Sequence, residues 1–346
     1  MSKRKLNFMI TGGAGFIGSN TARRLIRDGH DVTIIDNLSR TGTEENIRWL
    51  RGQGRFRFSK IDIRDAAALS KAVKRARPDA VIHLASQAAV TTSVENPYED
   101  FEINTLGTIN LLEAIRAVRP GAVLLFASTN KVYGGLPDVR IKRAQNGYTF
   151  RDLPNGIDES RPLDFHSPYG CSKGSADQYV RDYHRIYGLR TVVLRQSCIY
   201  GYRQFGVEAQ GWIAWFTIAA LTGRRLTIYG DGMQARDVLF IDDLIDCYLK
   251  TIRNIDTCEG EIYNIGGGPA NRLSLLELIS QLESLTGHSL DVQYAGWRPG
   301  DQKVYISNIA KAYRGLKWQP RTGVSAGLRR IFRWAEQNID TIRKYI

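Results

Sequence analysis

Tyr169 and Lys173 are the residues of this sequence whose types and spacing most clearly suggest chemistry. They stand four positions apart in residues 167–173, where the pattern predicts the beginning of a helix. Residues four apart lie on one face of a helix, so the ammonium of Lys173 is expected near the phenol of Tyr169. A neighbouring cation lowers the pKa of a tyrosine, which lets the phenolate act as a base near neutral pH. Tyr169 is therefore predicted to take a proton from a substrate hydroxyl.

A glycine-rich turn near the N-terminus suggests where a nucleotide could bind. An apolar, β-like run over residues 5–11 leads into the glycines of residues 12–18, and helical spacing follows over residues 19–28. Because glycine has no side chain, the backbone of such a turn can approach a pyrophosphate, and the N-terminus of the next helix faces the negative charge. The strand, turn and helix together predict a dinucleotide-binding element.

An acidic residue after the next predicted strand indicates which dinucleotide is bound. Residues 32–35 form a second apolar run, and Asp36 follows it, eighteen positions after Gly18. A carboxylate at this place can hydrogen-bond both ribose hydroxyls of adenosine and would repel a 2′-phosphate. NAD is therefore expected rather than NADP, although Arg40 nearby keeps the second choice open.

Strands and helices continue to alternate along the first 200 residues. With helical segments between them, further β-like runs occupy residues 56–59, 80–84, 123–127 and 191–195. This order predicts an α/β fold, a Rossmann-type doubly wound parallel sheet that binds ligands outside the carboxyl ends of its strands. Residues 1–200 are expected to be the NAD-binding domain that also carries Tyr169 and Lys173.

The pattern changes in the rest of the chain. Residues 134–168 lack periodicity and are predicted to form a long irregular excursion over the mouth of the pocket. After residue 200, single elements replace the repeated pairs, so residues 201–346 are expected to be mainly a smaller mixed α/β substrate-binding lobe, with some segments free to return to the sheet. The predicted elements are helices over residues 210–221, 274–285 (with a capping box from Ser274 to Glu277) and 326–339, and strands over residues 226–229 and 262–265.

Composition limits the remaining possibilities. The 346 residues, 43% of them hydrophobic and 24% charged, are enough for a globular protein with a substantial core. Four cysteines without CxxC spacing and five histidines without an HExxH pattern predict neither disulfides nor a metal site. The apolar run at the N-terminus is too short for a signal or a membrane span, so a cytoplasmic protein is expected. The formal charge of +13 is dispersed, and no membrane or nucleic-acid partner is expected.

Taken together, these motifs resemble the extended short-chain dehydrogenase/reductases, in particular the NAD-dependent epimerase/dehydratase family. The resemblance spans nearly the whole chain and implies an enzyme that modifies nucleotide-activated sugars with tightly held NAD. It also implies a homodimer or homotetramer that pairs through helices near residues 97–118 and 168–187. The motifs that carry it are Gly12, Gly15 and Gly18; Asp36; Asp62-Ile63; Ser128-Thr129 before Val132-Tyr133-Gly134; Tyr169 with Lys173; and Gly230-Asp231-Gly232 before Arg236-Asp237.

The resemblance also implies roles for individual residues. Thr129 would hydrogen-bond the reacting hydroxyl beside Tyr169, and Lys173 would hold the nicotinamide ribose, which makes these three the expected catalytic residues. The expected cofactor-binding residues are Gly12, Gly15, Phe16, Ile17, Gly18, Asp36, Asn37, Ser39, Arg40, Asp62, Ile63, Leu84, Ala85, Ser86, Gln87, Asn104, Ser128, Tyr169, Lys173 and Ser197. The expected substrate-binding residues are Thr129, Asn130, Cys198, Arg203, Gln210, Trp212, Tyr229, Arg236, Arg298 and Asp301.

Smaller details favour one reaction within the family. Sugar nucleotide 4,6-dehydratases carry an aspartate and a glutamate after the threonine, because elimination of water needs a further acid and base, whereas this chain has Asn130 and Lys131. The run Ser128–Gly134, residues 154–156 and the segments around Arg203 and Trp212 resemble those of nucleotide-sugar 2-epimerases. The expected reaction is inversion of carbon 2 through a 2-keto intermediate, converting CDP-paratose to CDP-tyvelose.

Other functions stay open on the sequence alone. One is a 2-epimerase of a GDP-hexose such as GDP-mannose or GDP-glucose, and another is a nucleotide-sugar 4-epimerase. A third is a non-catalytic member of the fold that senses dinucleotides or binds RNA, which the positive charge would suit. The chain also departs from the family at Cys198, where many members have an asparagine; a small thiol that shapes the pocket is expected there, because the proposed chemistry needs no nucleophile.

Overall fold

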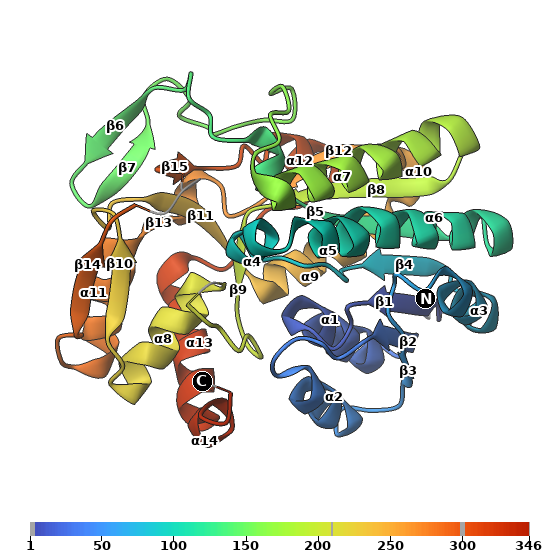
Figure 1. Cartoon of the computed structure of the whole chain (residues 1–346), viewed down its shortest axis with the longest axis horizontal. Helices are drawn as coiled ribbons and strands as arrows, with labels where there is room; N and C mark the ends of the chain where they lie inside the picture. Colours follow the sequence, from blue (N-terminus) through green and yellow to red (C-terminus); the bar gives the residue numbers. More distant parts are fainter. Residues whose placement is uncertain (1–3, 209, 298–301, 346) are drawn as a thin grey trace.

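A seven-stranded parallel sheet forms the centre of the protein in a computed structural model that describes residues 4–208, 210–297 and 302–345. The strand order is β12-β8-β5-β4-β1-β2-β3, with the order reversing beside β1, as in doubly wound folds (Figure 1). The strands of this sheet are β1 (Asn7–Thr11), β2 (Asp31–Asp36), β3 (Arg57–Lys60), β4 (Ala80–His83), β5 (Val123–Thr129), β8 (Arg190–Gln196) and β12 (Ile262–Ile265). The predicted Rossmann-type α/β fold is confirmed.

Both faces of the sheet are buried over its inner strands, which explains why β1, β2, β4 and β5 are nearly continuous apolar runs, whereas the edge strand β3 is partly exposed and more polar. Side chains alternate along a strand, so Phe8 and Ile10 belong to one core while Met9 belongs to the other. The first face is covered by α1 (Phe16–Arg27), α2 (Thr43–Arg51) and α9 (Ile241–Arg253), and the second by α3 (Ala66–Ala76), α6 (Gly107–Val118) and α7 (Ser167–Tyr187). Figure 1 shows α6 and α7 on one side of the sheet and α1 and α2 on the other.

Short segments lead from the strand ends toward the second face. They are α4 (Val90–Glu95), α5 (Pro97–Phe101), a π-helical turn (Glu102–Leu106) that continues into α6, and a 3-10 turn (Asn130–Tyr133) that follows β5. Turns of π type often accompany functional sites, because they turn a side chain out of the regular helical order. This one contains Asn104, which is 1% exposed.

The C-terminal part forms smaller sheets and returns once to the large one. Strand β12 follows β8 in the main sheet, so the segment after residue 200 is not confined to the second lobe. Strands β10 and β14 pair with each other, while β13, β11, β15 and β9 form a second small sheet. The elements are β9 (Cys198–Tyr200), α8 (Trp212–Thr222), β10 (Leu226–Tyr229), β11 (Ala235–Phe240), α10 (Ile255–Cys258), a 3-10 turn (Pro269–Asn271), β13 (Arg272–Ser274), α11 (Leu275–Thr286), β14 (Val292–Ala295), β15 (Val304–Tyr305), α12 (Ala310–Leu316), α13 (Val324–Gln337) and α14 (Ile339–Ile342).

The capping box predicted at Ser274 is confirmed. The Ser274 side chain accepts a hydrogen bond from the amide of Glu277, and the Glu277 carboxylate accepts one from the amide of Ser274. The reciprocal bonds satisfy two amides that helix geometry leaves without partners. Gly287, in the left-handed region at φ 78°, ends the helix.

The segment over residues 134–168 is more ordered than predicted. It contains the antiparallel hairpin of β6 (Ile141–Ala144) and β7 (Gly147–Phe150), and the amide of Tyr148 donates to the carbonyl of Met233 at 2.8 Å. Phe150 and Ile157 join a small core with Tyr305. The prediction of a long irregular excursion is therefore wrong for the β6–β7 hairpin, because residues from the C-terminal part of the chain supply the packing that the local sequence lacks.

Candidate active site

The glycine turn after β1 is shaped for close approach of a ligand. Gly12 has φ 68°, and a Cβ there would stand 2.6 Å from the amide nitrogen of Ala85. A Cβ at Gly18 would collide with the carbonyl of Gly12. Larger residues at Gly12 or Gly18 would therefore displace the turn. Helix α1 begins at Phe16 and Ile17, within the same turn. The arrangement directs the N-terminus of α1 toward the space above the turn, where an anion is stabilised.

Asp36 lies at the end of β2, beside this turn. Its carboxylate accepts hydrogen bonds from the amides of Ala14 at 2.9 Å and Leu38 at 2.8 Å. The residue is 8% exposed, and burial raises the pKa of Asp36 although the two amides oppose the shift. The amides thus fix the carboxylate at the edge of the turn, the position at which the ribose of a dinucleotide is expected.

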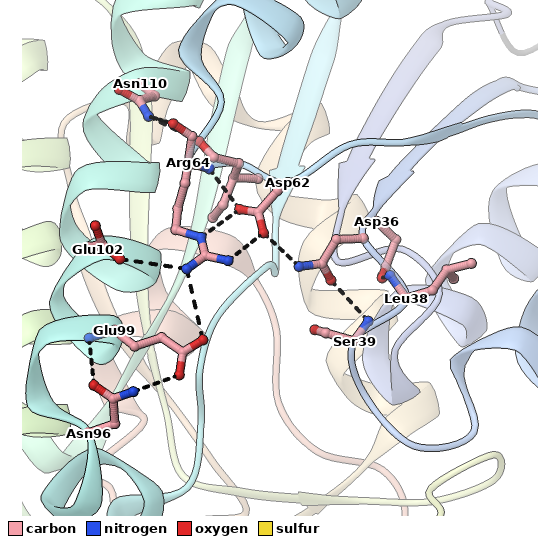
Figure 2. Close-up of polar contacts among 11 residues, drawn as sticks. Asp36, Leu38, Ser39, Asp62, Arg64, Asn96, Glu99, Glu102 and Asn110 are labelled. Carbon is pink, nitrogen blue, oxygen red and sulfur yellow. Dashed lines mark hydrogen bonds and ion pairs between the residues drawn. The ribbon is translucent and has the colours of Figure 1, made fainter.

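Asp62 is held by a network of charged and polar groups (Figure 2). Arg64 donates to both carboxylate oxygens, at 3.0 and 2.8 Å, and Asn37 donates to Asp62 at 2.9 Å. The hydrogen bonds from Arg64 are the main cause that lowers the pKa of Asp62 to about 2. The bond from Asn37 to Asp62 joins the segments after β2 and β3, and the amide of Ser39 holds the Asn37 side chain at 3.1 Å.

The end of β4 meets the π-helical turn. Leu84 and Ala85 follow the strand directly, and Leu84 donates its amide to Thr11 at 3.0 Å. The carbonyl of Gln87 accepts a hydrogen bond from Ser86 at 2.9 Å and one from Asn104 at 3.0 Å. The carbonyl oxygen of the Asn104 side chain is buried and receives no hydrogen bond from the described residues. An acceptor in this state is suited to a donor group on a ligand.

Tyr169 stands in the first turn of α7, next to Thr129 at the end of β5. The amide of Tyr169 donates to Ser93 at 3.1 Å, which fixes the turn against α4. Burial raises the pKa of the Tyr169 phenol to about 12; a hydrogen bond with Thr129 and the charge of Arg40 act in the opposite direction, and the charge of Asp100 adds to the rise. The two residues expected to meet the reacting hydroxyl are thus in contact.

Lys173 faces a different partner from the one expected. Its ammonium donates to the carbonyl of Ala127 at 2.7 Å and lies 4.2 Å from the ring centroid of Phe126. Lys173 is 3% exposed, and burial lowers its pKa to about 7. The predicted lowering of the Tyr169 pKa by Lys173 is therefore wrong for this structure, since burial dominates the phenol and the cation that acts on it is Arg40.

Two buried carboxylates near this pair were missed by the sequence analysis. Asp100 accepts hydrogen bonds from Gln87 at 3.0 Å, from Asn104 at 3.1 Å and from Ser172, which stands between Tyr169 and Lys173 in sequence. Its charge raises the pKa of both Tyr169 and Lys173. The four-residue spacing of Asp100 and Asn104 was the signal that could have indicated a shared helix face.

The second carboxylate, Asp177, lies one turn further along α7. It accepts two hydrogen bonds from Arg195, both at 2.9 Å, and one from Ser128 at 2.6 Å. Asp177 and Arg195 are 0% and 2% exposed. Because Ser128 and Arg195 belong to neighbouring strands β5 and β8, this buried ion pair sets the position of α7, and hence of Tyr169, relative to the sheet.

A second group of expected residues gathers on the side of the C-terminal lobe. Cys198 on β9 is hydrogen-bonded to Trp212 and lies within electrostatic reach of Lys131 and Arg236, while burial raises the pKa of its thiol. A thiol in this state is mainly protonated, which agrees with a packing role. The buried side chain of Asn130 accepts a hydrogen bond from Thr129 at 3.4 Å, so this group borders the Tyr169 pair.

Arg236 and Tyr229 occupy fixed positions on β11 and β10. The guanidinium of Arg236 donates to the carbonyls of Ala235 at 2.9 Å and Gln302 at 2.6 Å. The Tyr229 hydroxyl donates to Glu208 at 2.7 Å. Gln210 pairs through its backbone with Val207, just before α8.

The remaining expected residues are Ser197, Arg203, Arg298 and Asp301. The Ser197 hydroxyl donates to the buried carboxylate of Asp237 at 2.5 Å, so it is engaged within the protein. Arg203 is not brought to the Tyr169 group: its guanidinium donates to Asn46 on α2 at 2.8 Å and lies 4.9 Å from the centroid of Trp49. Arg298 and Asp301 lie outside the described residues.

The arrangement fits a bound dinucleotide. The glycine turn leaves room that a Cβ would fill, Asp36 stands where a ribose would lie, and Asn104 offers a buried acceptor. Within the described residues, no cluster of three or more histidine, cysteine or acidic side chains is arranged to hold a metal ion. No helix in the same part of the chain is long and apolar enough to cross a membrane.

Comparisons with known proteins agree with this geometry. Residues 8–266 match the profile of the NAD dependent epimerase/dehydratase family. The chain is 43% identical over 334 residues to the CDP-paratose 2-epimerase of Salmonella typhi, covering 95% of this chain and 99% of the relative.

Solved structures show the same fold over nearly the whole chain. The UDP-glucose 4-epimerase of Thermotoga maritima with UDP-glucose has a TM-score of 0.84 at 31% identity, covering 96% of this chain and 100% of that one. The UDP-glucose 4-epimerase of Thermus thermophilus in complex with NAD has a TM-score of 0.79 at 33% identity, covering 98% and 99% of the two chains.

Proposed function

We propose that this chain, which belongs to the NAD dependent epimerase/dehydratase family and acts with NAD on nucleotide sugars, inverts carbon 2 of a CDP-linked sugar and converts CDP-paratose to CDP-tyvelose. The observation that carries this proposal is the contact between Tyr169 and Thr129. The two residues after Thr129 are an amide and a cation, Asn130 and Lys131. A pair for moving one proton is present, and the adjacent acids that elimination of water would need are not at these positions. The identity to the Salmonella typhi 2-epimerase supports the choice of substrate.

The residues around the glycine turn and the first turns of α7 would hold NAD. The amides at the start of α1 suit the pyrophosphate, Asp36 suits the adenosine ribose, and Lys173 and Asn104 suit the nicotinamide end. When bound there, NAD supplies a reversible acceptor for the hydrogen on carbon 2. The oxidised sugar is a 2-ketone, which has lost the stereochemistry of that carbon.

Tyr169 and Thr129 would handle the proton. In this proposal the Tyr169 Oη takes the proton from the carbon 2 hydroxyl, while Thr129 Oγ1 keeps that oxygen within hydrogen-bond reach. After the ketone has turned its other face, the protonated Tyr169 returns a proton to the same oxygen. Because burial raises the pKa of the phenol, the first step needs a nearby cation that favours the phenolate, and the charge of Arg40 acts on Tyr169 in that direction.

The C-terminal lobe would hold the nucleotide diphosphate while the sugar turns. The guanidinium of Arg236 is oriented by hydrogen bonds to two backbone carbonyls, those of Ala235 and Gln302. Guanidinium groups bind phosphate oxygens through paired hydrogen bonds. Trp212 and Cys198 would form the wall beside the sugar and limit how far it moves.

The proposal is tested by the stereochemistry of the product. Purified protein is incubated with CDP-, UDP- and GDP-sugars in deuterated water, and products are identified by NMR. Inversion at carbon 2 of a CDP-sugar without deuterium on that carbon is expected, because the hydrogen removed is the one returned. Inversion only at carbon 4 would establish the 4-epimerase alternative, and deuterium at carbon 2 would exclude this mechanism.

A Tyr169→Phe variant provides the control for the proton step. It keeps the ring and the packing of α7 but loses the hydroxyl that contacts Thr129, so turnover should fall by at least about 100-fold. NAD content and the melting temperature should stay close to those of the wild type. Turnover near the wild-type rate would remove Tyr169 from the reaction.

A further inference from the structure

An arginine-lined cavity of about 750 Å³ lies apart from the candidate active site. Its walls come from α1, α2, α9 and α13, and none of Thr129, Tyr169 and Lys173 belongs to them. Figure 1 shows α1 and α2 facing α13 and α14 across this part of the molecule, on the face of the sheet opposite α7. The arginines that line the cavity are Arg23, Arg24, Arg27, Arg203, Arg330 and Arg333.

The lining carries more positive charge than the protein neutralises. Asp242 is the one acidic residue among the lining residues, and it pairs with Arg330 at 3.6 Å. Arg24 is neutralised from outside the cavity by Asp28 and Asp246, at 3.1 and 3.0 Å. The other lining arginines on α1 and α13 make no ion pair within 4.0 Å to a described carboxylate; they are Arg23, Arg27 and Arg333. Charges of one sign held together repel each other, so the cavity favours a counter-ion.

Arg203 provides an independent observation at the inner wall. The residue is 4% exposed, and its Nη2 is buried with no hydrogen-bond acceptor among the described residues. The nearest approach of a carboxylate to this atom is that of Glu45, at 3.9 Å, and Glu45 also pairs with Arg48. A buried donor without an acceptor is costly, and a ligand oxygen would remove the cost. Arg23 has a buried Nε in the same state.

Aromatic rings stand beside these guanidinium groups. Trp49 packs against Arg203 at 4.9 Å and Arg23 at 5.7 Å from its centroid, and Trp334 also lines the cavity. The ring of Trp49 restricts the guanidinium groups of Arg203 and Arg23, which lowers the entropy lost when a ligand binds. The volume is that of sites for small molecules, and the charge is too concentrated for a neutral one.

We propose that this cavity is a second ligand site that binds the polyphosphate group of a small molecule such as a nucleoside triphosphate. Guanidinium groups match phosphate oxygens in geometry as well as charge, and six of them converge here from two helices, α1 and α13, and the loop that carries Arg203. The site is independent of the proposed reaction, because it shares no residue with the Tyr169 group. It also gives Arg203 a role that the candidate active site does not.

The side chain of Asn46 connects the cavity to the glycine turn. Asn46 accepts the hydrogen bond from Arg203 and donates to the carbonyl of Ala14 at 2.9 Å, in the glycine turn. Ala14 in turn donates its amide to Asp36. A ligand that fixes Arg203 would therefore act on a residue that supports the dinucleotide turn.

The test uses the full chain saturated with NAD. Isothermal titration calorimetry at low salt measures binding of ATP and, separately, of inorganic tripolyphosphate; if both bind, the polyphosphate group is the recognised part, and if only ATP binds, the base contributes too. Arg27→Gln with Arg333→Gln should weaken binding at least about tenfold, because both side chains are exposed and lose only their charge. Arg253→Gln with Arg314→Gln is the matched control, with two exposed arginines outside the cavity, and should bind normally.

Three results would overturn the proposal. One is that neither anion binds in the low-salt titration, and another is that the cavity and control variants bind equally. The third is that Arg236→Gln abolishes the binding, which would assign the anion to the substrate lobe instead. Failure of any CDP-sugar to react leaves this test unaffected, because its readout is binding to the cavity.

Discussion

The ammonium of Lys173 donates a hydrogen bond to the backbone carbonyl of Ala127 at 2.7 Å, which ties α7 to the end of β5. The lysine is buried above the ring of Phe126, and its pKa is lowered to about 7 by that burial. Its charge therefore changes within the physiological range, close to Tyr169 and to the expected place of the nicotinamide ribose. This makes the pair of α7 residues sensitive to pH in a way that the spacing alone does not indicate.

Lys173→Met should change the pH dependence of stability. In the fold the lysine loses its proton near pH 7, whereas in the unfolded chain it keeps it to about pH 10.4. Between these values the unfolded state binds more protons, so this group makes unfolding less favourable as pH rises. The free energy of unfolding of the wild type minus that of Lys173→Met should therefore increase from pH 6 to pH 9, as measured by urea denaturation without added dinucleotide.

Lys142→Met is the control for that series, since Lys142 is exposed on the β6–β7 hairpin. Its difference from the wild type should be flat over the same range. A flat difference for Lys173→Met as well would show that the buried lysine keeps an ordinary pKa.

Asp100→Asn should lower the pKa of both Lys173 and Tyr169. The carboxylate raises both, because a negative charge favours the ammonium and disfavours the phenolate. The asparagine oxygen can still accept the bonds from Gln87 and Asn104, which both go to Oδ1 of Asp100, and its NH2 group can donate to the hydroxyl of Ser172, so α5 should remain packed. NMR titration of the lysine ammonium and ultraviolet titration of tyrosine would measure the two shifts. Glu95→Gln, at an exposed position on α4, should move neither value. Unchanged titrations in Asp100→Asn would show that the charge of Asp100 does not set the pKa of either residue.

The parts of the fold that the sequence predicted are those with local causes. The inner strands of the main sheet are apolar because both faces are covered, and the Ser274 cap depends on neighbours within a few residues. The β6–β7 hairpin was missed because Ile141–Ala144 are exposed and show no apolar alternation. Its stability comes from contacts with β11 and β13, far away in sequence.

The part of the candidate site that lies at the ends of the strands could also be predicted from the sequence. Residues at the carboxyl ends of parallel strands had to meet, so Asp36, Asp62 and Thr129 could be placed together in advance. The partner of Lys173 is a backbone carbonyl, which no residue type indicates. Arg203 stands in a segment that resembles relatives, yet its position depends on Asn46, 157 residues earlier in the chain.

Arg236→Lys should weaken substrate binding more than it slows turnover. The guanidinium is oriented by Ala235 and Gln302, and a lysine cannot reproduce its planar set of donors toward a diphosphate. For the sugar nucleotide that the protein accepts, KM should rise by about tenfold while kcat falls less. Arg253→Lys, at the exposed end of α9, should leave both constants unchanged. An unaltered KM in Arg236→Lys would show that other groups hold the diphosphate.

Asp177→Asn should be among the most destabilising single changes in the protein. It leaves the guanidinium of Arg195 buried, 2% exposed, without its charged partner, and loss of one member of a buried pair costs about 3–5 kcal/mol. Asp291→Asn breaks an ion pair of similar length, 2.8 Å to Arg225, whose side chains are 55% and 61% exposed, and should cost about 0–1 kcal/mol. Urea denaturation of the two variants compares the losses of stability directly.

Asp177 also accepts a hydrogen bond from the Ser128 hydroxyl, so Asp177→Asn should reduce turnover even at temperatures where the variant is folded. Equal stability of the two variants would mean that the Asp177–Arg195 pair does not hold α7 against the sheet.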